Sequence, residues 1–544
     1  MNRYIVVCSA FVLGALAASA QDTYENARLL GGDLNGTARY VGMGGALEAL
    51  GADISTISTN PAAVGVFRHS YASLSLGVVS QQDEKKFGNV GTTNLSFDQV
   101  GFVYSMQTNT NSFFNFAFNY HKNRNFDQIL SAANSLQNAS LAKHIFAKST
   151  YENDRNGGYY LDTNDRNEWV GYRDRTSNER AYPYTQLDYL YTNAVTMDDA
   201  TDPNHPINTY MEASDYQFNR AHSGWISEFD FNLSGNIDNR VFLGVTMGIY
   251  NVNYEGYSAY SEGILDSHNV FRGTHELVDE RKIEGTGIDL KLGAIFRPIE
   301  ESPFRIGVSV ATPTWYDLTS RNNTVLRNNT DNTIYNFGAD EYSNGDSYDF
   351  KYYTPWKFGL SLGHTIEDYL ALGASYEYTD YSSADTRVKD GYDGYGNEDS
   401  YSDKAMNDNT DKALKGVHTL KIGAEIKPDP AMAVRFGYNY VSPMFNNDGV
   451  RDNGLDSESN TYTSTADYTN WKDTHRITCG LGYKYDKLSF DVAYQYSVTN
   501  GTFHPFQNSL CYDPDDGTPL YNIGTTTEVS NKRHQILFTL GYTF

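Results

Sequence analysis

The residues of this chain that could do chemistry are few, and their spacing argues against most kinds of site. Gly42-Met43-Gly44-Gly45 has the glycines of a phosphate-binding loop. It lacks the apolar strand before it and the Lys-Ser/Thr pair after it that such loops use. The twelve histidines stand singly, without the short spacings of a zinc site. Neither a phosphate loop nor a metal site is therefore predicted.

A later acidic segment raises the question of calcium. Its carboxylates do not follow the spacing of a calcium loop, and we interpret them as a solvated surface: Asp390, Asp393, Glu398, Asp399 and Asp403. The chain also shows no nucleophile elbow and no Ser/His or paired-carboxylate arrangement that would support catalysis. We therefore predict that the protein is not an enzyme and carries no cofactor and no metal.

The charge and hydropathy of the chain restrict its class further. A formal net charge of −25 argues against nucleic acid as a partner, because phosphate backbones are bound by Lys and Arg. Mean hydropathy is −0.55, yet the chain holds 44 Tyr and 28 Phe. A transmembrane β-barrel reconciles these values, because each strand needs only about nine to eleven residues and every second residue faces a polar lumen.

Residues 1–20 have the order of a secretory signal peptide. Arg3 precedes an apolar run that ends in Ala-Ser-Ala at 18–20, and small residues at these positions are what a signal peptidase reads. The run is too short for a stable membrane span. The mature chain is then predicted to begin at Gln21 and to reach the outer membrane.

Strand-like alternation recurs from about residue 70 to the end of the chain. In 488–496, for example, Leu, Phe, Val, Tyr and Tyr alternate with Ser, Asp, Ala and Gln. We predict fourteen strands at 70–80, 94–106, 112–121, 224–235, 240–254, 285–297, 303–315, 350–364, 369–381, 416–427, 431–441, 474–485, 488–498 and 534–544. Short and long connections alternate between them, as in bacterial outer-membrane barrels.

The last strand supports a closed barrel. Its even positions from Ile536 to Phe544 are apolar, and the aromatic terminal residue Phe544 resembles the assembly signal that the barrel assembly machinery reads. Closure would remove the exposed strand edges. A secreted β-sandwich would also alternate, but it needs neither fourteen strands nor an aromatic end. The predicted fold is an all-β transmembrane antiparallel barrel with both ends in the periplasm.

The segment before the first strand carries a family resemblance. The run from Ala38 to Ala46, followed by Asn60-Pro61-Ala62, is similar to the N-terminal hatch of the FadL/TodX family of outer-membrane transport proteins. Further similar stretches are 354–360, 376–381 and 418–425. The resemblance implies a 14-stranded barrel (67–544) that is plugged by a hatch (21–66). It also implies passive uptake of hydrophobic small molecules such as long-chain fatty acids, with lateral exit through the wall at a kinked strand.

The residues of this segment suit a compact plug. The Asn60 amide can accept from a backbone N–H two residues on and fix a tight turn before Pro61 and Ala62. Glycines permit a close approach to the lumen wall: Gly42, Gly44 and Gly45. These residues are the predicted gate. In the alternative interpretation, 60–62 is only a linker turn.

Residues 122–223 form the longest interruption of the strand pattern and are predicted to lie outside the cell. Apolar residues at helical spacing occur at Ile129, Leu130, Ala133 and Leu136, at Leu141, Ile145 and Phe146, and at Leu187, Leu190, Tyr191 and Ala194. Such external helices either form a hydrophobic capture groove, as the resemblance implies, or pack on each other as a cap.

Two functions remain open at the level of sequence. The first is a transporter with a hydrophobic ligand, which predicts a continuous apolar channel. The second is a FadL-like barrel that acts as a docking or shuttle component of a secretion or surface-attachment system, which predicts a blocked or polar lumen. In either case we expect a monomer surrounded by outer-membrane lipid and lipopolysaccharide. An outer-membrane hydrolase would need a His, Ser or Asp cluster that the sequence does not show.

Overall fold

The computed structural model describes residues 22–149, 158–176, 179–198, 207–331, 333–337, 346–392, 398–512 and 517–544. The predicted signal peptide and Gln21 lie outside these ranges.

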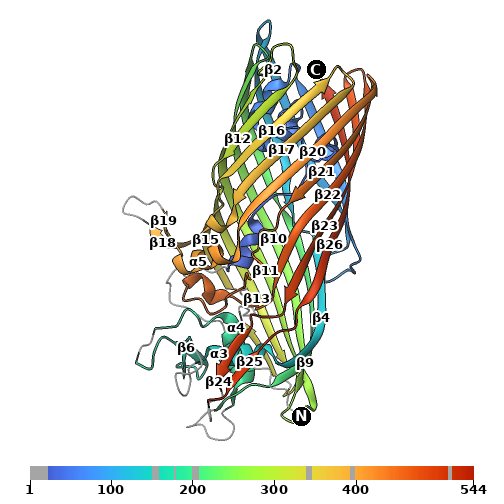
Figure 1. Cartoon of the computed structure of the whole chain (residues 1–544). Helices are drawn as coiled ribbons and strands as arrows, with labels where there is room; N and C mark the ends of the chain where they lie inside the picture. The colour runs from blue at the N-terminus through green and yellow to red at the C-terminus, as the bar shows by residue number, and fades with distance from the viewer. Residues whose placement is uncertain are drawn as a thin grey trace.

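The strands form a closed antiparallel barrel of 14 strands, as the sequence predicts (Figure 1). Ten run without interruption: β1 (Tyr71–Gln82), β2 (Thr93–Asn109), β9 (Glu212–Ile237), β10 (Val241–Leu265), β11 (Phe271–Phe296), β20 (Gly416–Asp429), β21 (Met432–Val441), β22 (Tyr468–Tyr485), β23 (Leu488–His504) and β26 (Thr527–Thr543). Closure is made between the first and last strands, whose register runs from Tyr71↔Thr543 to Gln82↔Lys532.

The other four barrel strands are each interrupted once. They are β3 with β4 (Ser112–Asn125, Gln128–Ala139), β12 with β13 (Arg305–Ala311, Trp315–Asn328), β15 with β16 (Asp346–Tyr353, Lys357–Ile366), and β17 with β18 (Leu370–Asp380, Asp385–Tyr392). Two interruptions contain Pro313 and Pro355, which cannot donate to a ladder. Backbone bonds still bridge them, because Thr312 donates to Leu290 (2.9 Å) and Thr354 donates to Thr314 (3.1 Å).

Several strands extend far beyond the predicted bounds. The strands β9, β10 and β11 hold 26, 25 and 26 residues. About nine to eleven residues cross a bilayer, so the outer halves of these strands stand beyond the membrane. Segment 321–349, predicted as a loop, begins as the continuation of β13 to Asn328. Alternation fades in these extensions because neither face meets lipid, whereas pairing with the neighbouring strands keeps them extended.

The outward-facing rows of the inner halves are apolar, as a lipid-facing surface requires. Exposed members include Leu243, Leu290, Leu362, Ile422, Leu481 and Phe538. Near the outer edge of this band, Tyr–His pairs on neighbouring strands satisfy each other's polar atoms: Tyr376–His418 (2.6 Å), Tyr438–His475 (2.7 Å) and Tyr494–His534 (2.8 Å). Together with barrel closure, this surface places the protein in the outer membrane.

Among the described residues, no helix is long and apolar enough to cross a membrane.

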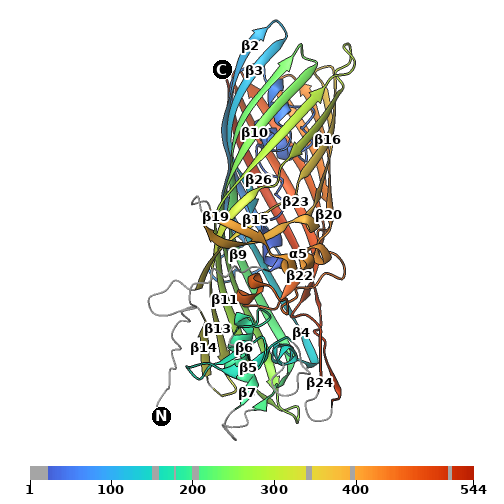
Figure 2. The same ribbon diagram turned by 90° about the vertical axis from the view of Figure 1, so that its left-hand side faces the viewer.

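The two ends of the barrel differ. The carboxyl end of the chain lies with the short turns, whereas helices α3 (Leu141–Lys148) and α4 (Gln186–Tyr191) lie toward the opposite end and α5 (Lys404–Ala413) lies between the two ends (Figures 1 and 2). For the amino end, the prediction of a periplasmic position falls on residues outside the described ranges. Asp22, the first described residue, pairs with Arg451 in the long loop between β21 and β22.

The helical spacing of residues 129–136 was misleading, because these residues form strand β4, which extends the wall beside β9. The second group falls on α3, and Leu187, Leu190 and Tyr191 of the third fall on α4, whereas Ala194 lies in the π-helical turn η4 (Thr192–Thr196) that follows. Their apolar side chains are buried in one cluster that includes Leu141, Ile145, Leu187 and Leu190 and reaches Phe218 of β9. The two helices therefore pack as a cap. Short strand pairs complete the outer region: β5 (Tyr160–Thr163) with β6 (Trp169–Tyr172), β7 (Met197–Asp198) with β8 (Ile207–Asn208), and β24 (Ser509–Tyr512) with β25 (Pro519–Asn522), together with β14 (Thr333–Phe337) and β19 (Glu398–Ser402).

A buried acid, Glu262, joins this cap to the outer end of β10. Its Oε1 accepts from the Tyr260 hydroxyl (2.6 Å) and from the backbone N–H of Leu141 (2.8 Å). Burial raises the pKa of Glu262 to about 7, so the neutral acid is favoured in the folded cap. Burial also lowers the pKa of His144 and of His275 to about 4, and both rings are therefore neutral near pH 7.

We expect the cap to loosen as the pH rises from about 4.5 to about 7. The folded pKa of Glu262 lies above the ordinary value of 4.5, so its contribution to stability is complete below that value and is lost as the pH rises through about 7. Between these two pKa values the loss is about 1.4 kcal/mol per pH unit, and above the folded pKa it is complete. Hydrogen exchange of the α3 amides, corrected for intrinsic rates, should be faster at about pH 9 than at about pH 6, and Glu262→Gln should remove the difference. Equal protection at both values in the unmodified protein would contradict this assignment.

Candidate functional site: a charged cavity inside the barrel

The N-terminal segment (Asp22–Phe67) lies inside the barrel in both views of the molecule (blue in Figures 1 and 2). It consists of α1 (Thr23–Asn26), α2 (Ala38–Gly42) and three 3-10 helices, η1 (Ala27–Leu29), η2 (Ile54–Ser58) and η3 (Pro61–Val66). Helix α2 packs on β22 and β23, and η3 packs on β9, β10 and β11 across the lumen. Most of its side chains are buried.

Asn60 forms the turn that its sequence predicts. Its Oδ1 accepts from the backbone N–H of Ala62 (3.1 Å) and caps η3, with Pro61 at the first helical position. The side chain is buried against two wall glycines, Gly293 of β11 and Gly307 of β12. A Cβ at Gly293 would overlap Asn60 Oδ1. The wall is therefore shaped to receive this turn.

Gly42, Gly44 and Gly45 lie where the segment runs along the inner face of the opposite wall. Gly44 has φ +63° and Gly45 has φ +84°, a conformation that favours glycine. Facing them, Gly437 of β21 approaches so closely that a Cβ there would overlap the Gly44 backbone nitrogen. Gly42 packs in the same way on Gly480 of β22, where a Cβ added at Gly42 would lie 3.3 Å from the Gly480 Cα. The glycines of the segment thus serve close contact with the wall.

The start of the segment is fixed near the outer end of the barrel by ion pairs. Glu25 pairs with Arg281 of β11 (2.6 Å) and with Arg451 (3.2 Å), and Asp22 also pairs with Arg451. All four side chains are buried. Removing one partner of such a buried pair leaves an uncompensated charge, so these contacts hold the segment at a defined height.

A cavity of about 330 Å³ lies between the segment and the wall. Its lining holds nine Lys or Arg side chains against four Asp or Glu: Arg28, Arg124, Arg220, Lys291, Lys357, Lys421, Lys472, Arg476 and Arg533 against Asp33, Glu228, Glu377 and Asp467. The excess of positive charge contrasts with the net charge of −25 on the whole chain. Carboxylates behind the lining compensate part of this excess, since Lys421 pairs with Glu48 and Lys472 with Glu528.

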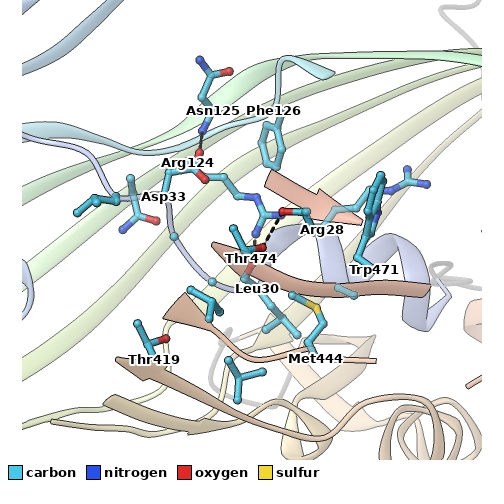
Figure 3. Close-up of a pocket in the computed structure, with 18 of the residues that line it drawn as sticks. Arg28, Leu30, Asp33, Arg124, Asn125, Phe126, Thr419, Met444, Trp471 and Thr474 are labelled. Atoms are coloured by element: carbon cyan, nitrogen blue, oxygen red, sulfur yellow. Dashed lines mark hydrogen bonds between the residues drawn. The ribbon is translucent and has the colours of Figure 1, made fainter. Parts of the chain in front are cut away.

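The lining of the same cavity also includes apolar side chains. It is lined by Leu30, Phe126, Val417, Val441, Met444, Phe445 and Trp471. Figure 3 shows Arg28, Arg124 and Asp33 in one cavity with Phe126, Met444 and Trp471. Charged donors beside an apolar wall suit a ligand that is itself amphipathic.

Three arginines from separate strands surround Asp33 of the segment. Arg476 Nη2 and Arg533 Nη1 each lie 3.9 Å from an Asp33 carboxylate oxygen. Arg124 donates to the backbone carbonyl of Leu30 next to them. Within the described part of the chain, Asp33 is the only carboxylate that pairs with Arg476 or Arg533. The positive charge of the three guanidinium groups therefore exceeds the single negative charge of Asp33. This excess favours the binding of a second anion.

The floor of the cavity contains a buried ionic network that spacing in the sequence did not reveal. His121, Glu228 and Asp230 offer ligand atoms within 4.8 Å of one another, although His121 lies on β3 and the two acids on β9. The Lys291 ammonium contacts Glu228, Asp230 (3.3 Å) and Asp289 (3.0 Å). The Lys291 ammonium thus provides these acidic side chains with the positive charge that a bound metal ion would provide.

The backbone ladder of the barrel wall is incomplete between β2 and β3. Their pairing stops at Gln99↔His121. Beyond this point, residues 93–97 of β2 pair only with β1, and Lys122, Arg124 and Asn125 of β3 pair only with β9. A bulge at Asp98, which has no partner in β1, bends β2 at the same level. We call this interruption the wall gap.

Side chains rather than backbone close the wall gap. Lys122 Nζ donates to Ser96 Oγ (2.7 Å), and Asn94 Nδ2 donates to Asp127 (3.1 Å). From inside, Asn35 Nδ2 donates to Asp98 (3.0 Å) and to the carbonyl of Lys122 (3.0 Å). A second cavity of about 70 Å³ lies behind the gap and shares Asp33, Asn35, Arg476 and Arg533 with the first. The three arginines around Asp33 (Arg124, Arg476 and Arg533, the arginine group) therefore lie next to the wall gap.

No protein-family model matches the chain, and no curated protein matches it. Solved structures that are similar to it include a FadL homologue of Pseudomonas aeruginosa (13% identity, 94% of this chain and 99% of that chain, TM-score 0.46). They also include the toluene transporters TbuX of Ralstonia pickettii (13%, 94% and 99%, TM-score 0.45) and TodX of P. putida (11%, 94% and 99%, TM-score 0.43). Similarity at these values does not identify a ligand, so function is taken from the cavity and the wall.

Proposed function

We propose that this barrel is an outer-membrane channel for the passive uptake of hydrophobic small molecules that carry an anionic head, such as long-chain fatty acids. The observation that carries the proposal is the cavity, in which Arg124, Arg476 and Arg533 lie beside an apolar wall. A carboxylate accepts charge-assisted hydrogen bonds from guanidinium groups, and an alkyl chain packs against Phe126 and its apolar neighbours.

The chemistry of the cavity differs from the continuous apolar channel that uptake predicts from the sequence. Its lining combines charged and apolar side chains, and the Arg124 guanidinium lies 5.7 Å from the centre of the Phe126 ring. A purely apolar ligand would have to displace water from the charged groups without replacing their hydrogen bonds, which is costly. An amphipathic anion avoids this cost. This is why we narrow the ligand class to molecules with an anionic head.

In this proposal the N-terminal segment acts as the hatch and the wall gap as the lateral exit. Fourteen strands enclose more space than their own side chains fill, and the segment occupies that space. Asn60, Pro61 and Ala62 form the part of the hatch that rests on wall glycines. We assign the exit to the wall gap because side chains close it, and side chains can move without breaking the backbone hydrogen bonds of the barrel.

We expect removal of the arginine pair to weaken carboxylate binding. Replacing both Arg476 and Arg533 with alanine should raise the Kd of the purified barrel for oleate at least tenfold, since a hydrogen bond to a charged group contributes about 1.5–3 kcal/mol. The Kd for oleyl alcohol should change little. The matched control is Arg240→Ala, at an exposed turn distant from the cavity. Equal affinity of the unmodified protein for oleate and the alcohol would contradict the anionic-head assignment.

A docking or shuttle role is the second candidate, because the lumen is largely filled and strongly polar. It predicts a barrel that binds no amphipathic anion. Mass spectrometry of the detergent-purified protein separates the two candidates. A copurified fatty acid that is lost from the Arg476→Ala, Arg533→Ala variant supports uptake, whereas the absence of both copurified and added ligand supports docking.

A further inference from the structure

Lys122 occupies an unusual position in the wall gap. It continues the outward row of β3 that contains Phe116, Phe118 and Tyr120, and it lies at the first residue past the last β2–β3 pair. Its ammonium donates to Ser96 Oγ across the wall gap and lies 5.7 Å from the centre of the Trp225 ring. Within the described residues, no carboxylate lies within 4.0 Å of this nitrogen. Lys122 is thus a cation at the mouth of the gap without an ion-pair partner.

The surface around Lys122 is apolar. Leu95 and Phe97 of β2 are 88% and 42% exposed, and Trp225 of β9 is 41% exposed. These side chains flank the gap on its lipid-facing side, because the outward rows of β2 and β9 carry them. The outer mouth of the gap therefore repeats the combination found inside the cavity, a cation beside an apolar surface.

The inner side of the gap presents an obstacle to an anion. Asp98 is buried there, with Oδ1 bonded to Asn35 and to Ser96 (2.7 Å), whereas Oδ2 has no hydrogen-bond partner. An anion that leaves the arginine group must pass this carboxylate and enter a medium of low polarity. An uncompensated charge is costly in such a medium. The Lys122 ammonium lies immediately beyond Asp98. It offsets both the repulsion by the Asp98 carboxylate and the cost of placing the anionic head in a medium of low polarity.

We propose that Lys122, Leu95, Phe97 and Trp225 form an exit site for the anionic amphiphile on the lipid face of the barrel. The head of the ligand moves from Arg476 and Arg533 to Lys122, which exchanges its bond to Ser96 for one to the ligand, while the alkyl chain lies on Leu95, Phe97 and Trp225. Because Lys122 also helps to close the gap through Ser96, the exchange loosens the wall at that contact as the anionic head leaves. The inference rests on the proposed uptake function and adds a second binding site to it.

The test separates transfer from binding. Barrels reconstituted in lipid vesicles are loaded with oleate or with oleyl alcohol, and the rate of transfer from the cavity to the surrounding lipid is measured together with the Kd. Lys122→Gln should slow the transfer of oleate about tenfold through loss of one charge-assisted bond, with the transfer of the alcohol and both Kd values unchanged. Lys122→Arg should restore the oleate rate. Lys85→Gln, in the exposed loop after β1, is the matched control.

The outcomes are distinguishable. If Lys122→Gln accelerates both ligands equally, Lys122 only closes the wall, and the exit site is refuted. If it leaves oleate transfer unchanged while oleate still binds the cavity, the exit site is refuted but the proposed uptake survives. If the unmodified barrel neither binds nor transfers oleate, the proposed function itself fails.

Discussion

Replacing Gly437 with alanine is expected to displace the N-terminal segment from the lumen wall. The new Cβ would overlap the backbone of Met43 and Gly44, which cannot move aside as a flexible side chain can. Overpacking of this kind costs about 3 kcal/mol, which shifts the balance between a seated and a displaced segment about a hundredfold. Residues 22–67 should become accessible to protease, and small solutes should leak through envelopes that carry the variant.

The control for Gly437→Ala is Gly235→Ala, where the added Cβ would meet only the Phe113 carbonyl oxygen at 3.2 Å. Both variants are compared at equal amounts of heat-modifiable, folded barrel, so a folding defect is not mistaken for an open lumen. A Gly437→Ala barrel that keeps its segment protected and its envelopes tight would show that the segment is not the barrier to solutes.

Deletion of Phe544 is expected to reduce sharply the amount of folded barrel in the outer membrane. The Phe544 backbone N–H donates to Ser70 (2.9 Å), at the seam where the last strand meets the first. Its ring packs on Tyr542 at a centroid distance of 4.9 Å and otherwise faces lipid. Loss of these contacts weakens closure by about 2–3 kcal/mol, and an unclosed barrel leaves strand edges unpaired in the bilayer.

Phe544→Tyr should retain the ring and most of the folded protein, and Phe271→Ala, at an exposed loop-side position of β11, should have no effect. Folded and unfolded forms are separated by their mobility before and after heating. Normal levels of the Phe544 deletion would show that the terminal residue is not needed for closure.

The barrel strands could be predicted because lipid imposes a strict rule on them. Wherever a strand meets lipid, every second residue must be apolar, and the row from Ile536 to Phe544 shows this directly. Where strands rise above the membrane, the rule no longer applies. Residues 129–136 then showed apolar spacing that fits a helix, although pairing with β9 makes them a strand. The outer extensions of β9 to β11 were missed for the same reason.

The candidate site could be predicted only in its local parts. The Asn60 turn depends on an amide and a backbone N–H two residues apart, so it could be predicted from the sequence. The wall glycines that receive it, such as Gly293, could not be distinguished from other small residues on an inner row. The exit site could not be predicted either, because Lys122 and Ser96 come into contact only at the point where the pairing of β2 with β3 ends.

The closed 14-stranded barrel and the class of surface that it presents to lipid follow from the sequence, because alternation and turn spacing are local properties that repeat along the chain. The chemistry of the lumen, in contrast, follows only from how distant segments come together. Asp33, Arg124, Arg476 and Arg533 are distant in sequence and meet because barrel closure brings β3, β22 and β26 around the N-terminal segment. Interactions between charges depend on distance in space and on exclusion of water, and neither can be obtained from spacing along the chain.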